Sequence, residues 1–259
     1  MDFLHKIKKL KTVCDPETYS KAKLKVVRRL SRRSSKPLTP EFLVSQLNAE
    51  KAREIRSRYG IANPGIDWPK YVEFERWFSK YILRAKDLGL DFGPAKRILD
   101  IGSGAGFFLY VCRKLGHDCL GLDFLEGQDP GAAKFYTETF ALFGLERVIW
   151  RIKPFVPLPD LGAPFDLVTA FMICFDDHFE PHRWKRAEWE FFMDDLQSRM
   201  HPGGQIRLEL NPGPGNQIFH TGVRELFEER GGIFDGSAYV TFGVEKDYHR
   251  RLRRIVRTT

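Results

Sequence analysis

The chain has 259 residues, of which 42% are hydrophobic and 29% are charged. This length and composition predict one domain of ordinary size, or one domain with an appendage, and exclude a disordered chain, a collagen-like repeat and a small disulfide framework. No uncharged apolar run approaches the roughly 18 residues that a membrane span needs, so we expect a soluble protein. The net charge of +8 is concentrated at the two ends, because residues 1–40 carry 12 Lys and Arg against 3 Asp and Glu, and residues 245–259 carry 6 against 2.

The first 38 residues predict a basic, partly helical arm. Drawn as a helix, Phe3, Ile7, Leu10 and Cys14 fall on one stripe with lysines around it. Residues 1–35 of such an arm suit an anionic membrane surface or RNA, and an arm with no partner explains the same pattern equally well. The N-terminus lacks the apolar segment of an export signal, and the four cysteines lack the spacing of a zinc site. We therefore expect reduced thiols and a cytoplasmic protein, peripheral to the membrane if the arm binds lipid.

Residues 39–92 predict a helical cap region ahead of the first strand. Thr39 is a residue type that caps helices and it directly precedes Pro40, so the first helix is predicted to run from there to Gly60. A second helix is expected to begin near residues 67–69. It carries a mostly aromatic stripe at helical spacing, formed by Tyr71, Phe74, Trp77, Phe78, Tyr81 and Ile82. That stripe is most simply a packing face, and the alternative is that it lines a substrate pocket.

Residues 93–245 alternate short apolar strands with helices, and a basic tail follows at residues 246–259. The predicted strands are 98–101, 119–123, 148–152, 167–175, 205–210 and 238–244. The predicted helices are 107–115, 130–143, 186–200 and 221–230. Strands that alternate with helices of this length indicate βαβ units, so the predicted fold class is α/β with a doubly wound, mostly parallel sheet.

The turn after the first of these strands reads Asp100-Ile101-Gly102-Ser103-Gly104-Ala105-Gly106-Phe107. In an open parallel sheet, ligands bind beyond the carboxyl ends of the strands, where the strand order reverses. The turn lacks the Gly-Lys-Ser/Thr of a P-loop, and Phe107 or Leu109 stands where a dinucleotide fingerprint has its third glycine. The remaining pattern, D-x-G-x-G-x-G after an aliphatic strand, resembles the class I S-adenosylmethionine-dependent methyltransferases over roughly residues 90–245.

The resemblance implies S-adenosyl-L-methionine as the cofactor. This ligand carries a sulfonium, an ammonium and a carboxylate but no phosphate, so Asp100 and the Gly102–Gly106 backbone would face its methionine part. Asp123, at the end of the second strand, would accept hydrogen bonds from both ribose hydroxyls. The implied cofactor-binding residues are Asp100, Gly102, Ser103, Gly104, Gly106, Asp123, Phe124 and Phe171.

The segment after the third strand departs from the family's pattern. Members often place Asp or another polar residue there to hold the adenine amino group, whereas this chain reads Ile152-Lys153-Pro154-Phe155. Adenine would then be held by main chain and by contact with Phe155, or its ring would be flanked by Phe124 and Leu125.

The segment after the fourth strand faces the cofactor methyl in this fold and carries the candidate catalytic residues. His178 is the candidate general base, because an imidazole titrates near neutral pH, and Asp176, Asp177 and His182 are the other candidates. Asp176 or Asp177 with Asn211 offers oxygen ligands for Mg²⁺, but this pattern is too sparse to predict a metal site. A further alternative is that these residues belong to a polar loop with no catalytic part.

The fourth strand is not followed by the Asn/Asp-Pro-Pro-Tyr tetrad of enzymes that methylate nucleobase or amide nitrogens. The sequence therefore predicts a methyltransferase that transfers a methyl group to an oxygen or nitrogen of a small-molecule or glycan/lipid-linked acceptor. Two alternatives stay open: an RNA- or protein-directed methyltransferase that uses the basic tails, and a non-catalytic scaffold of the same fold.

Overall fold

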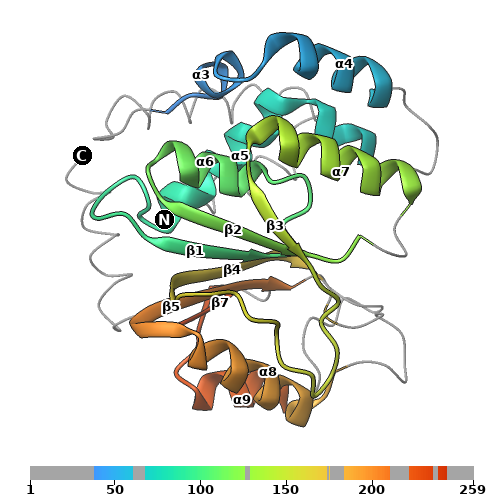
Figure 1. The fold of residues 1–259 in the computed structure, drawn as a ribbon. Helices are drawn as coiled ribbons and strands as arrows, with labels where there is room; N and C mark the ends of the chain where they lie inside the picture. Colours follow the sequence, from blue (N-terminus) through green and yellow to red (C-terminus); the bar gives the residue numbers. More distant parts are fainter. Residues whose placement is uncertain are drawn as a thin grey trace, which may run out of the picture. The chain divides into compact units, whose positions relative to one another are not determined.

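The computed structural model describes residues 38–60, 68–125, 129–173, 175, 184–210, 222–235 and 239–243, whose elements are shown in Figure 1. The predicted basic tail and all of the predicted basic arm except Leu38 lie outside these residues. Among the helices that are described, none is long and apolar enough to cross a membrane.

The strands form one seven-stranded sheet in the order β3-β2-β1-β4-β5-β7-β6 (Figure 1). Their bounds are β1 Arg97–Ile101, β2 Asp118–Asp123, β3 Glu146–Ile149, β4 Phe165–Ile173, β5 Met200–Leu210, β6 Ile233–Asp235 and β7 Tyr239–Phe242. Strand β4 pairs in parallel with β1 and β5, whereas β7 pairs antiparallel with β5 and β6. The strand order runs outward in both directions from the β1–β4 pair, which confirms the predicted α/β class with a doubly wound, mostly parallel sheet.

Helices precede the sheet and alternate with its strands along the chain. They are α3 Pro40–Ser45, α4 Ala49–Tyr59, the short 3-10 helix η1 Trp68–Val72, α5 Phe74–Asp87, α6 Phe107–Lys114, α7 Pro130–Phe143, α8 Arg186–Ser198 and α9 Val223–Glu229. The chain divides into two compact units. The first unit holds the helices from α3 to α7, and the second holds most of the sheet together with α8 and α9.

The first unit has an aromatic core that joins α5 to α6. Phe74 and Phe78 of α5 are fully buried, and their ring centroids lie 5.6 Å and 5.1 Å from that of Phe107 on α6. Phe143, the last residue of α7, lies 5.2 Å from the same ring. Tilted and edge-to-face pairs of this kind contribute about 0.5–1.5 kcal/mol each beyond their buried area. The predicted aromatic stripe is therefore confirmed as a packing face from Phe74 to Ile82. Its first residue, Tyr71, lies in η1, because the helix predicted to begin near residues 67–69 is divided into η1 and α5.

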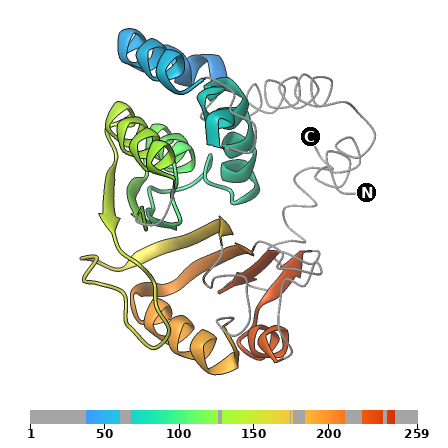
Figure 2. The same cartoon turned by 90° about the vertical axis from the view of Figure 1, so that its right-hand side faces the viewer.

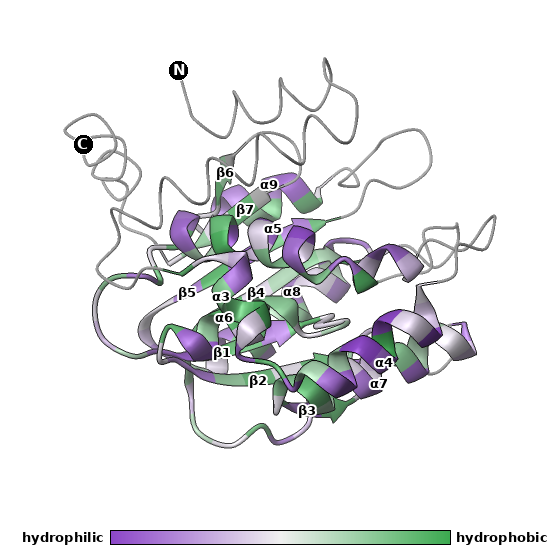
Figure 3. Ribbon diagram, turned by 90° about the horizontal axis from the view of Figure 1, so that it is seen from above, coloured by the Kyte–Doolittle hydropathy of each residue, from purple (hydrophilic) through white to green (hydrophobic). Residues whose placement is uncertain are grey.

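Two helices replace the single one that the sequence predicts from Pro40 to Gly60. The side chain of Asn48 accepts a hydrogen bond from the backbone N–H of Lys51 at 3.0 Å and so begins α4 as a separate helix. Helix α4 then lies beside α7, with hydrophobic and hydrophilic residues alternating along both helices (Figure 3). The Tyr59 hydroxyl donates to Glu138 on α7 at 2.9 Å.

The core of the second unit lies on one face of the sheet. Leu99, Val168, Ile206 and Phe242 stand opposite one another on four neighbouring strands and belong to one buried cluster with the apolar residues of α8 and α9. Figure 2 shows α8 and α9 on the same side of these strands. Because side chains alternate between the two faces of a strand, the next residue along each of these strands faces the other way.

The third strand is shorter than the sequence predicts. It ends at Ile149 rather than at residue 152, and the chain from residue 150 to residue 164 contains no helix or strand. Four of those residues are prolines, which cannot donate hydrogen bonds to a neighbouring strand. The three-residue strand β6 was not predicted, and it is held by its antiparallel pairing with β7.

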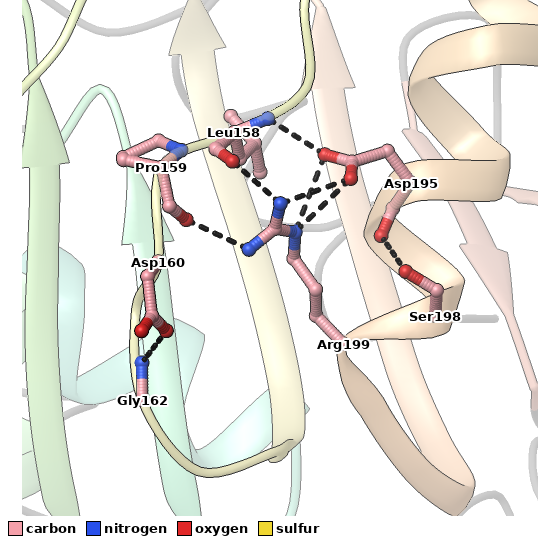
Figure 4. A network of polar contacts seen from close by, with 7 residues as sticks. All are labelled: Leu158, Pro159, Asp160, Gly162, Asp195, Ser198 and Arg199. Atoms are coloured by element: carbon pink, nitrogen blue, oxygen red, sulfur yellow. Dashed lines mark hydrogen bonds and ion pairs between the residues drawn. The ribbon is translucent and has the colours of Figure 1, made fainter.

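Arg199, directly after α8, holds this irregular connection in place (Figure 4). Its guanidinium donates to the carbonyl oxygens of Leu158 and Pro159 and also to the carboxylate of Asp195. The other oxygen of Asp195 accepts the backbone N–H of Leu158 at 2.8 Å. The carbonyl groups of Leu158 and Pro159 belong to no helix or strand, and Arg199 provides their hydrogen-bond donors.

Arg199→Met is expected to lower the free energy of unfolding by about 2–3 kcal/mol, because it leaves two carbonyls and a carboxylate without their shared donor. Urea denaturation followed by tryptophan fluorescence measures this loss. The control is Arg76→Met, which removes an exposed ion pair with Glu73 and should change stability by less than about 1 kcal/mol. Equal losses in the two variants would contradict the structural role of Arg199.

Candidate functional site

The turn after β1 contains three glycines in the left-handed region, with φ values of 69° at Gly102, 51° at Gly104 and 81° at Gly106. A Cβ added to Gly102 would lie 2.2 Å from a methyl carbon of Ile173, and one added to Gly106 would lie 2.8 Å from the ring of Phe140. At Gly104 the added atom would meet no described atom within 4 Å. Two of the glycines are thus required by packing, whereas Gly104 leaves open space beside the main chain where a ligand can approach.

The start of this turn is anchored to the end of β2. The backbone N–H of Gly102 donates to the carbonyl oxygen of Leu122 at 2.8 Å, and that of Ser103 donates to the same oxygen at 3.4 Å. Ser103 is buried, and its hydroxyl oxygen has no hydrogen-bond partner within the described part of the chain. Such a hydroxyl costs about 1–3 kcal/mol when its hydrogen bond is not made, which marks Ser103 as a candidate ligand contact.

Asp100, in β1, is the first buried acid of the site and is only 4% exposed. Its Oδ1 accepts a hydrogen bond from the hydroxyl of Thr169 at 2.7 Å. Thr169 lies directly opposite Asp100 on β4. A carboxylate buried in this way is stable only when hydrogen bonds or opposite charges compensate its lost hydration.

Asp123 ends β2 and is the second buried acid, with 7% of its surface exposed. Its Oδ1 accepts a hydrogen bond from the backbone N–H of Phe124 at 2.7 Å, and its backbone carbonyl oxygen accepts one from the backbone N–H of Trp150 at 2.9 Å. Burial lowers the pKa of Arg147 on the neighbouring strand β3, and the negative charge of Asp123 opposes that shift. Arginine stays protonated at neutral pH despite such a lowered pKa. Arg147 therefore carries a positive charge that interacts with the carboxylate of Asp123.

The aromatic residues proposed to contact the cofactor occupy different environments. The guanidinium of Arg151 lies 4.9 Å from the ring centroid of Phe124. Phe171, near the carboxyl end of β4, is buried. Phe155 is instead 54% exposed, and its ring lies 5.9 Å from that of Phe191 on α8. A contact between Phe155 and adenine stays a prediction.

Strand β4 bulges outward at Met172. Phe171 pairs with Glu209 and Ile173 pairs with Leu210, so between these two pairs β4 contains one residue more than β5, namely Met172. Its φ of 58° is rare for a residue other than glycine, and the residue is 46% exposed. Backbone strain of this kind costs about 1–3 kcal/mol and clusters at functional sites, where bulges aim side chains at ligands. Met172 is therefore a candidate site residue that the sequence did not indicate.

The predicted catalytic residues Asp176, Asp177 and His178 lie outside the described residues, as do His182 and Asn211. Their role in deprotonating an acceptor stays a prediction. Within the described ranges, no group of three or more His, Cys, Asp or Glu side chains is placed to hold a metal ion.

In the second unit, neighbouring strands bring together Asp100, Gly102, Ser103 and Asp123, all predicted from the sequence. Gly104 and Gly106 belong to the first unit, and they continue the same turn along the chain. Besides Met172, the sequence did not indicate Thr169 or Arg147. Thr169 could have been found as a polar residue inside the apolar run of β4. Arg147 could be linked to Asp123 only through the pairing of their strands.

No family model matches the chain, and no curated protein matches it. The similar solved structures include the ribosomal protein L11 methylase of Lactobacillus delbrueckii subsp. bulgaricus, at 16% identity over 64% of this chain and 74% of that one, with a TM-score of 0.39. They also include CalS10, an amino pentose methyltransferase from Micromonospora echinaspora, at 19% identity over 62% of this chain and 63% of that one, with a TM-score of 0.41. A third is Streptomyces venezuelae DesVI, at 14% identity over 62% of this chain and 91% of that one, with a TM-score of 0.43. The chain thus spans less than two thirds of the length of CalS10.

Alanine substitutions at two glycines of the turn should differ in their cost. Gly104→Ala is expected to lower the free energy of unfolding by about 1–2 kcal/mol, because only the positive φ opposes it. Gly102→Ala should cost about 3 kcal/mol or more, since its Cβ would also overlap Ile173. Chemical denaturation of both variants measures the difference, and a larger loss for Gly104→Ala would contradict the packing described for Gly102.

Substitutions at Met172 should show the reverse of the usual preference of a β-strand for valine over asparagine. Met172→Asn and Met172→Val both remove the methionine contacts, but asparagine tolerates a positive φ and a β-branched side chain does not. We expect the asparagine variant to be more stable than the valine variant by about 1 kcal/mol, although valine is ordinarily the better strand residue. Thermal and urea unfolding test this order, and a valine variant of equal or greater stability would rule out a strained backbone at this position.

Proposed function

We propose that this chain is a methyltransferase that uses S-adenosyl-L-methionine as its methyl donor. The observation that carries this proposal is the turn from Asp100 to Gly106, with all three glycines at positive φ, at the point where the strand order reverses. Asp123 supports it, because it is a buried acid at the end of the neighbouring strand. The same residues carry the resemblance to class I methyltransferases.

The residues present fit this cofactor. Asp100 would bind the ammonium of the methionine part, and Asp123 would accept hydrogen bonds from the ribose hydroxyls. The open space beside Gly104 admits a ligand to the main chain, and the buried hydroxyl of Ser103 would gain the partner it lacks among the described residues. Phe107 is buried in the aromatic core of the first unit, so the glycine that a dinucleotide fingerprint has there is replaced by a packed ring.

The cofactor, when bound, supplies a methyl group activated by a positively charged sulfur. The chain's own residues then act by position, since two acids on neighbouring strands would fix the cofactor at its methionine and ribose parts. In the proposed transfer, the methyl carbon would lose its bond to sulfur and gain one to the acceptor oxygen or nitrogen. The proton of an acceptor hydroxyl would pass to a base, for which we propose His178, with Asp176 and Asp177 as the other candidates.

For the acceptor we propose an oxygen or nitrogen of a small molecule or a glycan-like molecule. The sequence after β4 lacks the tetrad of enzymes that methylate nucleobase or amide nitrogens. Met172 at the carboxyl end of β4 adds an exposed apolar side chain, which suits the carbon skeleton of a small acceptor. An RNA or protein acceptor held by the basic tails is the alternative outcome of an acceptor screen.

Titration calorimetry with S-adenosylmethionine and S-adenosylhomocysteine tests the cofactor. Asp123→Asn keeps an oxygen that can accept the N–H of Phe124 but loses the negative charge offered to the ribose hydroxyls. We expect this variant to bind both ligands at least about tenfold more weakly than the wild-type protein.

Asp118→Asn is the matched control, because Asp118 is an exposed acid at the other end of the same strand. It should leave both affinities unchanged, and NAD should bind to neither variant nor to the wild-type protein. Tight binding of NAD, or no binding of either adenosyl ligand to the wild-type protein, would overturn the proposed function.

A further inference from the structure

A row of buried polar residues crosses the sheet on the face opposite the apolar core of the second unit. Asp100, Thr169, Arg207 and Thr241 stand opposite one another on β1, β4, β5 and β7. Each of the four is at most 5% exposed. The rows before and after them along these strands belong to the apolar cluster of the other face. Because buried polar groups cost stability unless they are hydrogen-bonded, this row calls for a specific explanation.

Thr169 connects this row to the proposed cofactor site. It is fully buried, and its hydroxyl lies 2.7 Å from Oδ1 of Asp100 and 3.4 Å from the carbonyl oxygen of Leu99. The shorter distance is that of a strong hydrogen bond to a charged acceptor, whereas the longer one is at the limit for any hydrogen bond. A hydroxyl has one proton to donate, so Asp100 is its principal acceptor.

The backbone and side chain of Thr169 are both held rigidly. The residue is paired within the sheet on both sides, with Asp100 on β1 and Arg207 on β5. A threonine side chain is also branched at Cβ, which restricts its rotation. The hydroxyl therefore presents its proton from a fixed place and restricts the rotation of the Asp100 carboxylate.

We propose that Thr169 is a positioning residue for the cofactor, which it serves by holding the Asp100 carboxylate in the orientation that receives the ammonium group of the methionine part. This inference rests on the proposed function. It adds a specific consequence: loss of the hydroxyl should weaken binding only of ligands that carry the amino acid part. A carboxylate that must be ordered on binding gives a lower affinity than one that is ordered beforehand.

Thr169→Val tests the proposal, because valine keeps the branched shape and removes the hydroxyl. We expect its affinity for S-adenosylhomocysteine to fall by about tenfold. Its affinity for 5′-methylthioadenosine, which has the adenosine part but no amino acid part, should change by less than about twofold. Thr169→Ser restores the hydroxyl and should restore most of the affinity for S-adenosylhomocysteine.

Thr241→Val is the matched control, because Thr241 lies in the same row, is equally buried and bonds to Arg207 rather than to Asp100. It should destabilise the sheet to a similar extent and leave the affinity for S-adenosylhomocysteine unchanged. If Thr169→Val does not fold, the comparison of Thr169→Ala with Thr169→Ser provides the same contrast.

The outcomes separate this inference from the function on which it rests. A wild-type protein that binds neither adenosyl ligand overturns both. Normal binding of S-adenosylhomocysteine by Thr169→Val overturns the inference alone, and so does an equal loss of affinity for both ligands, since general damage to the site would weaken both. A loss confined to S-adenosylhomocysteine and reversed by serine supports the positioning role.

Discussion

The parallel pairing of β1 with β4 is the constraint on which the rest of the second unit depends. It sets Asp100 opposite Thr169 and brings Gly102 so close to Ile173 that no side chain fits at the glycine. The strand order also reverses at this pair, so the chain does not connect β1 directly to β4. No such connection covers the ends of these two strands. The proposed binding site at the turn after β1 is therefore supported by the sheet topology as well as by the glycines.

The two faces of the sheet differ in the rows of residues that they bury. One face carries apolar rows that pack with α8 and α9, where burial of side chains provides the main driving force for folding. The other face carries the row of Asp100, Thr169, Arg207 and Thr241, whose burial has to be offset by hydrogen bonds. The bulge at Met172 adds backbone strain at the end of the same strand that carries Thr169. Costs of this kind persist where the surrounding structure over-determines them.

Local signals predicted several elements well. The errors arose where a local signal is ambiguous or where residues distant in the chain fix the structure. Helix α7 matches its predicted bounds to the residue, because Asp129 caps one end, Pro130 begins the first turn and Gly144 ends the last. The prediction of a single helix through Asn48 was wrong, because an asparagine can lie inside a helix or begin a new one. The third strand was predicted to end at residue 152 rather than at Ile149, because the apolar residues before Pro154 resemble a strand. The connection after β3 is instead held by Arg97 and Arg199, which lie far from it in the chain and donate to the carbonyl oxygens of Leu161 and Pro159.

The sequence by itself determined the α/β class, the glycine turn and the two acids at the ends of the first two strands. These depend on periodicity, on glycines that adopt positive φ and on residues adjacent in the chain, all of which are local properties. Only the tertiary structure decided that Thr169 bonds to Asp100, that Arg147 lies in the field of Asp123 and that β4 bulges at Met172. The physical reason is strand register, because it sets which residues far apart in the chain stand opposite one another, and a shift of one residue would turn each side chain to the other face.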